Sequence, residues 1–488
     1  MQLRELISEG VEVERAVGDL EVEITALAYD SRRVRPGTLF FCVVGERADG
    51  HDFASTAVEA GAAALVVERE LSELGGVAQI VVAEARAAMA PLAARLAGDP
   101  TRELRVVGVT GTNGKTTTAF LIHEILESAA IQSGLLGTVK QVVGAVETEV
   151  ERTTPEAIDL QPTFRQMLEG GDRACVMEVS SHALELRRAD AIHFEVALFT
   201  NLTQDHLDFH GGMEEYFLAK RRLFAELEPG TAVVNVDDPY GQRLAMDFEC
   251  LTFSAEGEAA DYVARDVEFD STGATFVISG AEGEATVRTA LPGHFNVANA
   301  LGAFVVAVAL GLSPHEAAQG LEAASRVPGR FEPIDEGQDF AVLVDYAHTP
   351  DSLENVLRAA RPLTAGRLIS VFGAGGDRDR DKRPKMGRAG TEGSDLAIVT
   401  SDNPRSEDPG AIIAEILDGI EGSDGVEVEP DRRAAIARAL GAAEPGDTVV
   451  IAGKGHEQGQ EFEDGRKVPF DDREVAREEL IRLAGGYR

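Results

Sequence analysis

The sequence contains no tryptophan, only three cysteines, and no apolar run long enough to cross a membrane. Its longest apolar stretch, Leu301–Leu312, falls short of the roughly 20 residues that a membrane-spanning helix needs, and it predicts a buried helix. The first residues, MQLREL, carry charges where a signal peptide requires an apolar core. We therefore expect a cytoplasmic protein without membrane insertion.

The cysteines are Cys42, Cys175 and Cys250, which are odd in number, far apart and in no C-x-x-C pair. This pattern is typical of reduced thiols in the cytoplasm and argues against a disulfide framework. We interpret all three as packing residues.

Positive charge is scarce: 46 Lys and Arg stand against 84 Asp and Glu, for a formal net charge of −38. Such a charge repels nucleic acid and anionic membranes, so neither is expected as a partner. An anionic substrate must find a local basic pocket. The acidic excess is compatible with a salty or hot habitat and equally with simple solubility.

The length of 488 residues predicts two to four domains of roughly 100–200 residues each. Short β-rich runs and Ala-rich helices alternate over residues 1–98, which predicts a small α/β domain. Asp99-Pro100 and the Pro/Gly turn at 325–331 separate this block from a second, at 99–328, and from a third, at 329–488. The expected fold class is α/β throughout, with an antiparallel patch between Ala274 and Thr289.

The segment Gly108–Thr118, GVTGTNGKTTT, follows the apolar run Leu104–Val109 and precedes a helical pattern at 119–127. A strand, a glycine-rich turn and a helix start in this order bind phosphates through backbone N–H groups. Lys115 would contact a β- or γ-phosphate and Thr116 a Mg²⁺ ion, so the sequence predicts ATP binding.

Two further motifs follow predicted strands of the central block. Glu178 ends the strand that begins at Ala174, and His206 lies in TNLTQDHLD after the strand that begins at Val196. A carboxylate and an imidazole beside a triphosphate are plausible Mg²⁺ ligands, since Mg²⁺ takes one or two protein groups besides phosphate and water. For His206 alone, a hydrogen-bonded histidine near a helix start is the alternative.

The third block shows four predicted strands, at 342–346, 368–372, 396–400 and 448–452, with helical patterns between them. This arrangement predicts a doubly wound sheet, in which ligands gather beyond the carboxyl ends of the strands. Each strand is followed there by an unusual motif, and in chain order these are DYAH, GAGGDR, DNPR and GKGHE. The motifs together indicate a binding face.

Other candidates carry little signal by themselves. Lys220 lies on a helical stretch where a solvated lysine is the default. Arg187 and Arg188 read either as surface charges or as an anion site. Thr153 and Thr154 precede Pro155, and helix capping explains them equally well.

In this order the motifs resemble the Mur ligases of peptidoglycan synthesis, and the resemblance runs along essentially the whole chain. The matching segments are DSR, GTNGKTT, TTP, EVSSH, TNLTQDHLDFHG, KRRLF, GHFNVANA, GRFE, DYAHTPDSLENVL, GGDRDRDKRP, DNPR and GKGHE. The family's architecture implies an N-terminal UDP-binding domain, a central P-loop ATPase-like domain and a C-terminal Rossmann-like domain. One departure is Leu186, where several relatives carry a glutamine that contacts the sugar nucleotide.

The resemblance also assigns site residues. It implies nucleotide binding by Gly111, Thr112, Asn113, Gly114, Lys115, Thr116, Thr117, Asn296, Arg330, Asp345 and His348. It implies binding of the UDP-muramoyl dipeptide by Tyr29, Ser31, Thr153, Thr154, Ser180 and Arg188, and of diaminopimelate by Arg378, Asp402, Asn403, Pro404, Arg405, Gly453 and Glu457. Magnesium would be held by Thr116, Glu178 and His206, with Lys220 converted by CO₂ to a carbamate; Lys115, Glu178, His206 and Lys220 form the implied catalytic set.

The implied reaction adds meso-2,6-diaminopimelate to UDP-N-acetylmuramoyl-L-alanyl-D-glutamate through an acyl phosphate, and releases ADP and phosphate. A planar guanidinium suits the distal carboxylate of diaminopimelate, so Arg405 and Arg378 favour this amino acid over lysine. We expect a monomer. The alternatives are a sister enzyme, such as a folylpolyglutamate synthase or a lysine-adding ligase, and a nucleotide-dependent scaffold protein without chemistry.

Overall fold

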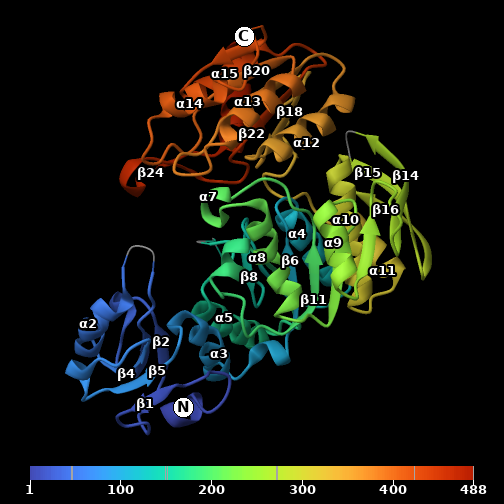
Figure 1. Ribbon diagram of the computed structural model, residues 1–488. Coiled ribbons are helices and arrows are strands. Elements are labelled where there is room, and N and C mark those ends of the chain that lie inside the picture. Colours follow the sequence, from blue (N-terminus) through green and yellow to red (C-terminus); the bar gives the residue numbers. More distant parts are fainter. Residues whose placement is uncertain (46–47, 149, 151, 271–272, 423, 487–488) are drawn as a thin grey trace. The chain divides into compact units, whose positions relative to one another are not determined.

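A computed structural model describes the chain except residues 46–47, 149, 151, 271–272, 423 and 487–488 (Figure 1). Its residues form two compact units. The first unit comprises Met1–Thr110, Ala130–Leu198 and Ala219–Ala232, and the second comprises Gly111–Ala129, Phe199–Leu218 and Val233–Arg488. The division runs through the predicted central block, so the three-domain boundaries stay a prediction.

The N-terminal part of the first unit is a five-stranded sheet in the order β1-β5-β4-β3-β2, parallel except for β1. Its two faces are covered by separate apolar clusters, because strand residues such as those of β3 are buried on both sides. The strands are β1 (Arg15–Val17), β2 (Ala26–Ala28), β3 (Thr38–Phe41), β4 (Ala62–Val67) and β5 (Ala78–Val81), and the helices are α1 (Leu3–Leu6), α2 (Ala54–Glu59) and α3 (Ala85–Leu96).

The rest of the first unit is built on strands in the order β11-β6-β10-β7-β8-β9. β10, the strand predicted to begin at Ala174, pairs in parallel with both β6 and β7, while β8 and β9 are antiparallel additions. The elements are β6 (Arg105–Thr110), β7 (Ser133–Leu136), β8 (Gln141–Val143), β9 (Val146–Thr148), β10 (Ala174–Glu178), β11 (Phe194–Phe199), α5 (Ala157–Gly170), α6 (Ser181–Glu185) and α8 (Met213–Ala225).

In the second unit, helix α4 (Lys115–Ser128) follows the phosphate loop and packs against α10 (His294–Ala309) and α11 (Pro314–Ala323). The apolar run Leu301–Leu312 falls largely within α10 and is buried, as predicted. The other elements of this part of the chain are α7 (Leu207–His210), α9 (Pro239–Asp247), β12 (Thr231–Asn235), β13 (Leu251–Ser254), β14 (Tyr262–Asp270), β15 (Gly273–Gly280) and β16 (Gly283–Thr289). The pairs β14–β15 and β15–β16 are antiparallel, which confirms the predicted patch.

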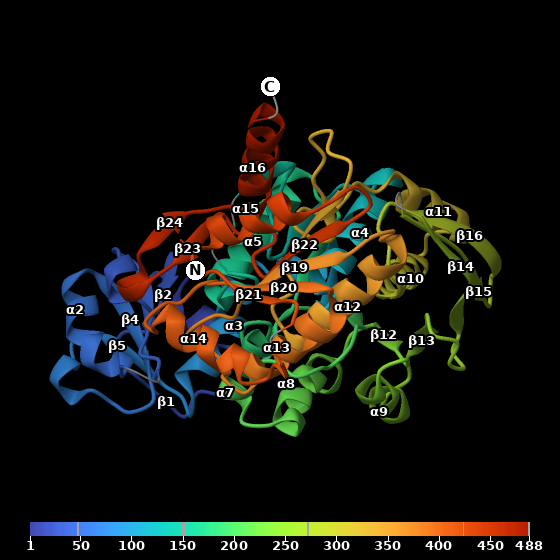
Figure 2. The ribbon, with the colours of Figure 1, turned by 90° about the horizontal axis from the view of Figure 1, so that it is seen from above.

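The C-terminal sheet has the order β17-β18-β22-β19-β20-β21, and its only antiparallel pair among the described strands is β17–β18. One apolar cluster packs under α12, α13 and α14 and another under α15 and α16, so the sheet is doubly wound as predicted (Figure 2). The elements are β17 (Glu332–Pro333), β18 (Ala341–Asp345), β19 (Leu368–Phe372), β20 (Leu396–Val399), β21 (Val426–Val428), β22 (Thr448–Ala452), β23 (Gly459–Glu461), β24 (Lys467–Pro469), α12 (Pro350–Ala360), α13 (Lys382–Gly393), α14 (Pro409–Leu417), α15 (Arg432–Ala442) and α16 (Asp472–Gly486).

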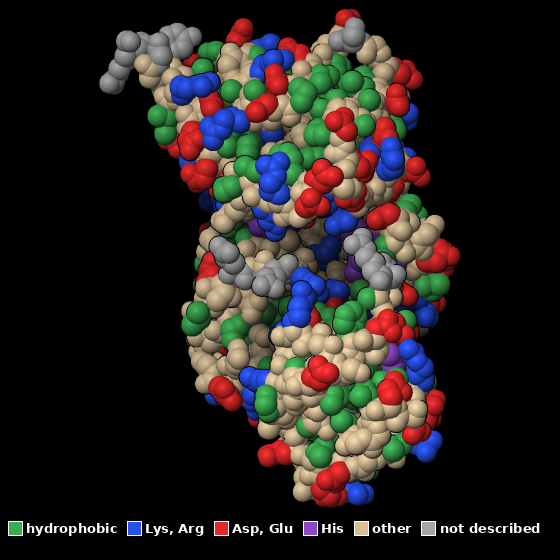
Figure 3. Space-filling model, turned by 90° about the vertical axis from the view of Figure 1, so that its left-hand side faces the viewer, with side chains coloured by type: hydrophobic (Ala, Val, Ile, Leu, Met, Phe, Trp, Pro, Cys, Tyr) green, Lys and Arg blue, Asp and Glu red, His purple; other side chains and the backbone are tan. Residues whose placement is uncertain are grey.

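Exposed side chains of both charge signs are interspersed over the face drawn in Figure 3. Within the described residues, no helix combines the length and the apolar character needed to cross a bilayer. Cys42 and Cys175 are buried and Cys250 is partly buried, in agreement with a packing role.

Candidate functional site

The predicted phosphate loop lies between β6 and α4, and two of its glycines are required by space. Gly111 and Gly114 have φ values of +149° and +85°. A Cβ at Gly111 would lie 1.8 Å from Thr200 Oγ1, and one at Gly114 would lie 2.3 Å from Asn299 Oδ1. Both positions therefore require glycine, and the resulting tight turn is of the kind in which backbone N–H groups can bind a phosphate.

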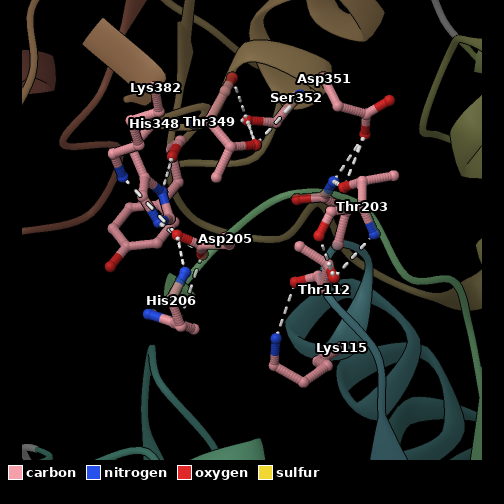
Figure 4. A network of polar contacts seen from close by, with 12 residues as sticks. Thr112, Lys115, Thr203, Asp205, His206, His348, Thr349, Asp351, Ser352 and Lys382 are labelled. Atoms are coloured by element: carbon pink, nitrogen blue, oxygen red, sulfur yellow. Dashed lines mark hydrogen bonds and ion pairs between the residues drawn. The ribbon is translucent and has the colours of Figure 1, made fainter. Parts of the chain in front are cut away.

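Lys115 folds back over this loop (Figure 4). Its Nζ donates hydrogen bonds to Gly111 O at 3.0 Å and to Thr112 O at 2.8 Å. The Thr112 hydroxyl in turn donates to Thr203 O at 3.1 Å. These bonds hold the lysine at the mouth of the loop, from which it can turn toward a bound phosphate.

Other predicted nucleotide residues meet at the start of α4. Arg330 Nη2 donates to Thr116 Oγ1 at 3.0 Å, and its guanidinium lies 4.4 Å from the ring centroid of Tyr346. Asp345 accepts from the amides of Phe331 and Ala347; burial raises its pKa, and nearby Arg330 opposes that rise. Arg330 Nε is buried and has no hydrogen-bond partner among the described residues, so a donor is left over for an anionic ligand.

Asn296 is connected to α4 by hydrogen bonds through Asn299. It is 1% exposed, donates to Pro292 O at 2.8 Å and accepts from Asn299 Nδ2 at 3.2 Å. Asn299 Oδ1 accepts from the Thr118 hydroxyl at 3.3 Å. The sequence reasoning missed Asn299, although its spacing of three residues from Asn296 places both on one helical face.

The segment after Phe199 carries a buried carboxylate that the prediction also missed. Asp205 Oδ2 lies 3.3 Å from His206 Nε2 and 3.9 Å from His348 Nε2, while Oδ1 lies 3.7 Å from Lys382 Nζ (Figure 4). Burial would raise the pKa of Asp205, but the charges of His206, Lys382 and His348 outweigh it and hold that pKa well below its usual range. The predicted residues His206 and His348 thus share one anion.

A second link joins the phosphate loop to α12. Asp351 Oδ2 accepts from Asn113 Nδ2 at 2.8 Å and from the Thr203 hydroxyl at 3.3 Å (Figure 4). Burial raises the pKa of Asp351, and these hydrogen bonds oppose the rise. Asp351 lies in the DYAHTPDSLENVL segment, where only Asp345 and His348 were predicted.

In the first unit, the end of β10 gathers the residues predicted for the muramoyl substrate. Thr154 Oγ1 donates to Glu178 O at 2.8 Å, and the Ser180 amide donates to Thr154 Oγ1 at 3.2 Å. Thr153 Oγ1 lies 3.2 Å from Thr138 Oγ1, and the Thr138 amide donates to Glu178 Oε1 at 2.6 Å.

Helix capping, the alternative for Thr153 and Thr154, is wrong. Helix α5 begins at Ala157, its N-cap is Glu156, and no side chain accepts a capping hydrogen bond there. Thr154 is instead 2% exposed and bound to the strand end, because the helix starts two residues later than the capping pattern requires.

Tyr29 and Ser31 flank Asp30, which caps the short 3-10 turn Ser31–Arg33. Burial lowers the pKa of Arg188, and Tyr29 is among the groups within electrostatic range of that guanidinium. Leu186 ends α6 as its C-cap residue.

Lys220 lies on α8 as predicted, but it is 1% exposed, so the default of a solvated lysine is wrong. Lys220 and Glu178 belong to the first unit, whereas Thr116 and His206 belong to the second. Within the described residues, no group of three or more His, Cys, Asp or Glu side chains is arranged to hold a metal.

Residues of the DNPR and GKGHE motifs form one buried polar cluster at the strand ends of the C-terminal sheet. Lys454, 0% exposed, donates to Asn403 Oδ1 at 2.8 Å and to Glu457 Oε2 at 3.0 Å. Gly453 has a φ of +125°, and a Cβ there would lie 2.5 Å from Asp402 Oδ2. Burial would raise the pKa of Asp402, but Lys454 and other cations lower it below its usual range. Lys454 belongs to the predicted GKGHE motif, but no role was predicted for it.

Arg405 and Arg378 flank the glycine loop after β19, since a Cβ at Gly375 would lie 3.1 Å from Arg405 Nη1 and 3.9 Å from Arg378 Cγ. Arg405 Nε donates to Glu461 at 3.0 Å, and Nη1 donates to Gly376 O at 2.7 Å. Arg378 is exposed and donates to Asp377 O. The structure thus places the Arg405 guanidinium and the aliphatic part of Arg378 beside the glycine loop, with Arg405 anchored and Arg378 at the surface.

Three family models match the chain: the Mur ligase family catalytic domain at residues 23–97, the Mur ligase middle domain at 109–307, and the Mur ligase glutamate ligase domain at 329–455. A UDP-N-acetylmuramoyl-L-alanyl-D-glutamate–2,6-diaminopimelate ligase of Streptomyces coelicolor is 48% identical, over 96% of this chain and 95% of its own length. The enzyme of that name from Syntrophomonas wolfei is 46% identical, over 98% and 99%. A solved structure with the same name matches at a TM-score of 0.71 and 33% identity, covering 99% of both chains.

Proposed function

This chain belongs to the Mur ligase family, and on that premise we propose that it joins meso-2,6-diaminopimelate to UDP-N-acetylmuramoyl-L-alanyl-D-glutamate in peptidoglycan synthesis. The observation that carries the proposal is similarity over nearly the full length, 46–48%, to relatives that bear this enzyme's name. The phosphate loop and the polar cluster at the C-terminal strand ends agree with it.

Forming the amide requires activation of the γ-carboxylate, because a carboxylate is a poor electrophile and the hydroxide it would have to expel is a poor leaving group. The D-glutamate γ-carboxylate attacks the γ-phosphorus of ATP, which gives an acyl phosphate and ADP. The amine of diaminopimelate then attacks the acyl carbon, loses a proton, and expels phosphate. The residues do this mainly by positioning and charge neutralisation: the loop amides and Lys115 bind phosphate oxygens, and Arg330 adds a second cation.

Two of the three residues predicted to hold magnesium, Thr116 and Glu178, supply the oxygen donors that Mg²⁺ prefers, and His206 supplies an imidazole nitrogen. We assign its protein ligands to the Thr116 hydroxyl, the Glu178 carboxylate and His206, with phosphate and water completing the shell, since Mg²⁺ takes few protein groups. When bound, the ion offsets charge on the transferring phosphoryl group.

We assign Lys220 a carbamate, formed when its amine nitrogen adds to CO₂ and releases a proton. The support is its burial at 1% exposure on α8, away from bulk water. Intact-mass measurement of protein kept in bicarbonate tests this, because the modified chain is heavier by one CO₂ and a Lys220→Ala chain is not.

The remaining sites follow the family pattern. We assign diaminopimelate to the strand-end cluster, with Arg405 and Arg378 on its distal carboxylate, and the UDP end of the other substrate to Tyr29 and Ser31. The protein is proposed to be a cytoplasmic monomer with domains at 1–98, 99–328 and 329–488.

One assay tests the proposal. Purified enzyme receives ATP, Mg²⁺, the UDP-linked dipeptide and, in turn, diaminopimelate, lysine or ornithine, and phosphate release and product mass are measured. Release that depends on diaminopimelate supports the proposal. Preference for lysine, or for glutamate on a folate, identifies a sister ligase, and nucleotide binding without release identifies a scaffold.

A further inference from the structure

An arginine cluster surrounds one buried carboxylate in the first unit. Glu156, with a side chain 6% exposed, has Arg86 Nη1 at 3.4 Å from Oε2, and Arg152 Nη1 at 3.3 Å and Arg188 Nε at 2.9 Å from Oε1. Arg86 comes from α3 and Arg188 follows α6, so the cluster joins the N-terminal sheet to the end of β10. Neither Arg86 nor Arg152 lies in any of the sequence motifs. We refer to these four residues as the Glu156 cluster.

The Glu156 cluster contains more positive than negative charge. Within the described part of the chain, Glu156 is the only carboxylate paired with any of its three guanidiniums, which leaves two positive charges in excess. Arginine stays protonated in proteins, so this excess is permanent. Partly buried charge without a partner is costly, and Arg86 and Arg188 are only 21% and 16% exposed.

The hydrogen bonds are also incomplete. Each guanidinium carries five N–H donors, whereas Glu156 offers two oxygen atoms. The two hydrogen bonds from Arg86 and Arg152 are long, at 3.4 and 3.3 Å, and Arg188 Nε, despite its 2.9 Å distance, makes no hydrogen bond with the described residues. Donors therefore remain for another anion.

The surroundings identify which ligand supplies that anion. Arg188 Nη1 donates to Thr154 O at 3.3 Å, and the Thr154 hydroxyl donates to Glu178 O. Tyr29, predicted for the UDP end of the same substrate, lies within electrostatic range of Arg188. The cluster thus lies among the residues assigned to the UDP-muramoyl dipeptide, which carries a diphosphate and a free D-glutamyl α-carboxylate.

We infer that Arg86 and Arg152, together with Arg188, form a subsite for an anionic oxygen group of the UDP-muramoyl dipeptide, with Glu156 holding the guanidiniums in place. This inference rests on the proposed function. Planar guanidinium groups bind carboxylate or phosphate oxygens in pairs, which gives both charge and orientation. In a chain of net charge −38, such a subsite is the local basic pocket that an anionic substrate requires.

Steady-state kinetics of an Arg86→Ala enzyme tests the inference. Loss of a hydrogen bond to a charged group predicts a rise in KM for the UDP-muramoyl dipeptide of about 10- to 100-fold, with kcat and the KM values for ATP and diaminopimelate unchanged. Arg86→Lys restores the charge without the planar fork and recovers part of the loss. The matched control is Arg95→Ala on the same helix, because Arg95 pairs with the exposed Glu9. Thermal unfolding of each variant confirms that folding is intact.

A substrate analogue distinguishes the two anionic groups, the diphosphate and the D-glutamyl α-carboxylate. UDP-N-acetylmuramoyl-L-alanyl-D-isoglutamine keeps the γ-carboxylate acceptor but replaces the α-carboxylate with an amide. If the Arg86→Ala penalty disappears with this substrate, the subsite binds the α-carboxylate, and if it persists, the subsite binds the diphosphate. An unchanged KM for the natural substrate in a folded, active Arg86→Ala enzyme overturns the inference. An inactive wild-type enzyme overturns the proposed function instead.

Discussion

The Glu156 cluster in the first unit contrasts with the buried arginines of the C-terminal sheet in the second. Arg383, 0% exposed, contacts both Glu407 and Glu415 at 2.7 Å, and Arg380 also binds Glu415, so two guanidiniums meet two carboxylates. Arg432 and Asp472 form a pair at 2.6 Å in which both side chains are 0% exposed. The Glu156 cluster instead combines three guanidiniums with one carboxylate.

This difference in charge balance distinguishes arginines that stabilise the fold from arginines that are available to bind a ligand. Where charges are matched, Arg383 donates to Gly375 O and Arg432 to Ala452 O at the strand ends. These sites fix the loops that carry the strand-end motifs. Arg188 makes one such bond as well, to Thr154 O, so the charge balance alone distinguishes the two classes. Where charge is left over, the local structure is incomplete without a further anion. Each class therefore predicts a different consequence of mutation.

The largest effect is expected on stability, from Asp472→Asn. This change leaves the Arg432 guanidinium buried without its carboxylate, and breaking one side of a buried pair costs about 3–5 kcal/mol. Urea denaturation followed by circular dichroism measures the free energy of unfolding. The control is Glu478→Gln, which removes one side of the exposed Arg433–Glu478 pair and should change it by about 0–1 kcal/mol. Equal effects of the two variants would contradict the structural class.

Arg405 is paired within the fold and is also proposed to bind a ligand. Its side chain is 21% exposed and donates to Glu461 and to Gly376 O, and Arg405→Ala tests the ligand-binding role. We expect KM for diaminopimelate to rise about 10- to 100-fold, since a charge-assisted hydrogen bond to the distal carboxylate is lost, while ATP binding is kept. Amino-acid kinetics and nucleotide calorimetry measure the two quantities. Arg438→Ala, which removes an exposed arginine paired with Glu427 and Glu429, is the control. Unchanged amino-acid kinetics would refute the assignment of Arg405.

The contrast also explains what the sequence could predict. The phosphate loop and the four strand-end motifs were predictable because each is a short segment whose spacing and preceding strand are visible locally. The pair Arg86–Glu156 joins residues 70 positions apart, and Asn113–Asp351 joins residues 238 apart, so no local pattern marks them. The burial of Lys220 was likewise hidden, because composition predicts a solvated lysine and only packing of α8 determines otherwise.

The smallest expected effect is a pH dependence at the balanced Arg383 site. Hydrogen bonds from the Arg383 side chain lower the pKa of Glu407 from its ordinary 4.5 to about 2, against a smaller opposing effect of burial. Because the pKa is lower in the folded state, the stabilisation is fully present above pH 4.5 and is lost as the pH falls toward 2. Glu407→Gln should therefore lower the urea midpoint at neutral pH, and its difference from wild type should narrow as acid is added. Glu421→Gln, at an exposed position, should show no such narrowing. If the difference in urea midpoint between Glu407→Gln and wild type stayed constant across this pH range, Arg383 would not be paired with an ionised Glu407. The charges at Arg383 would then not be balanced, and the contrast with the Glu156 cluster would be wrong.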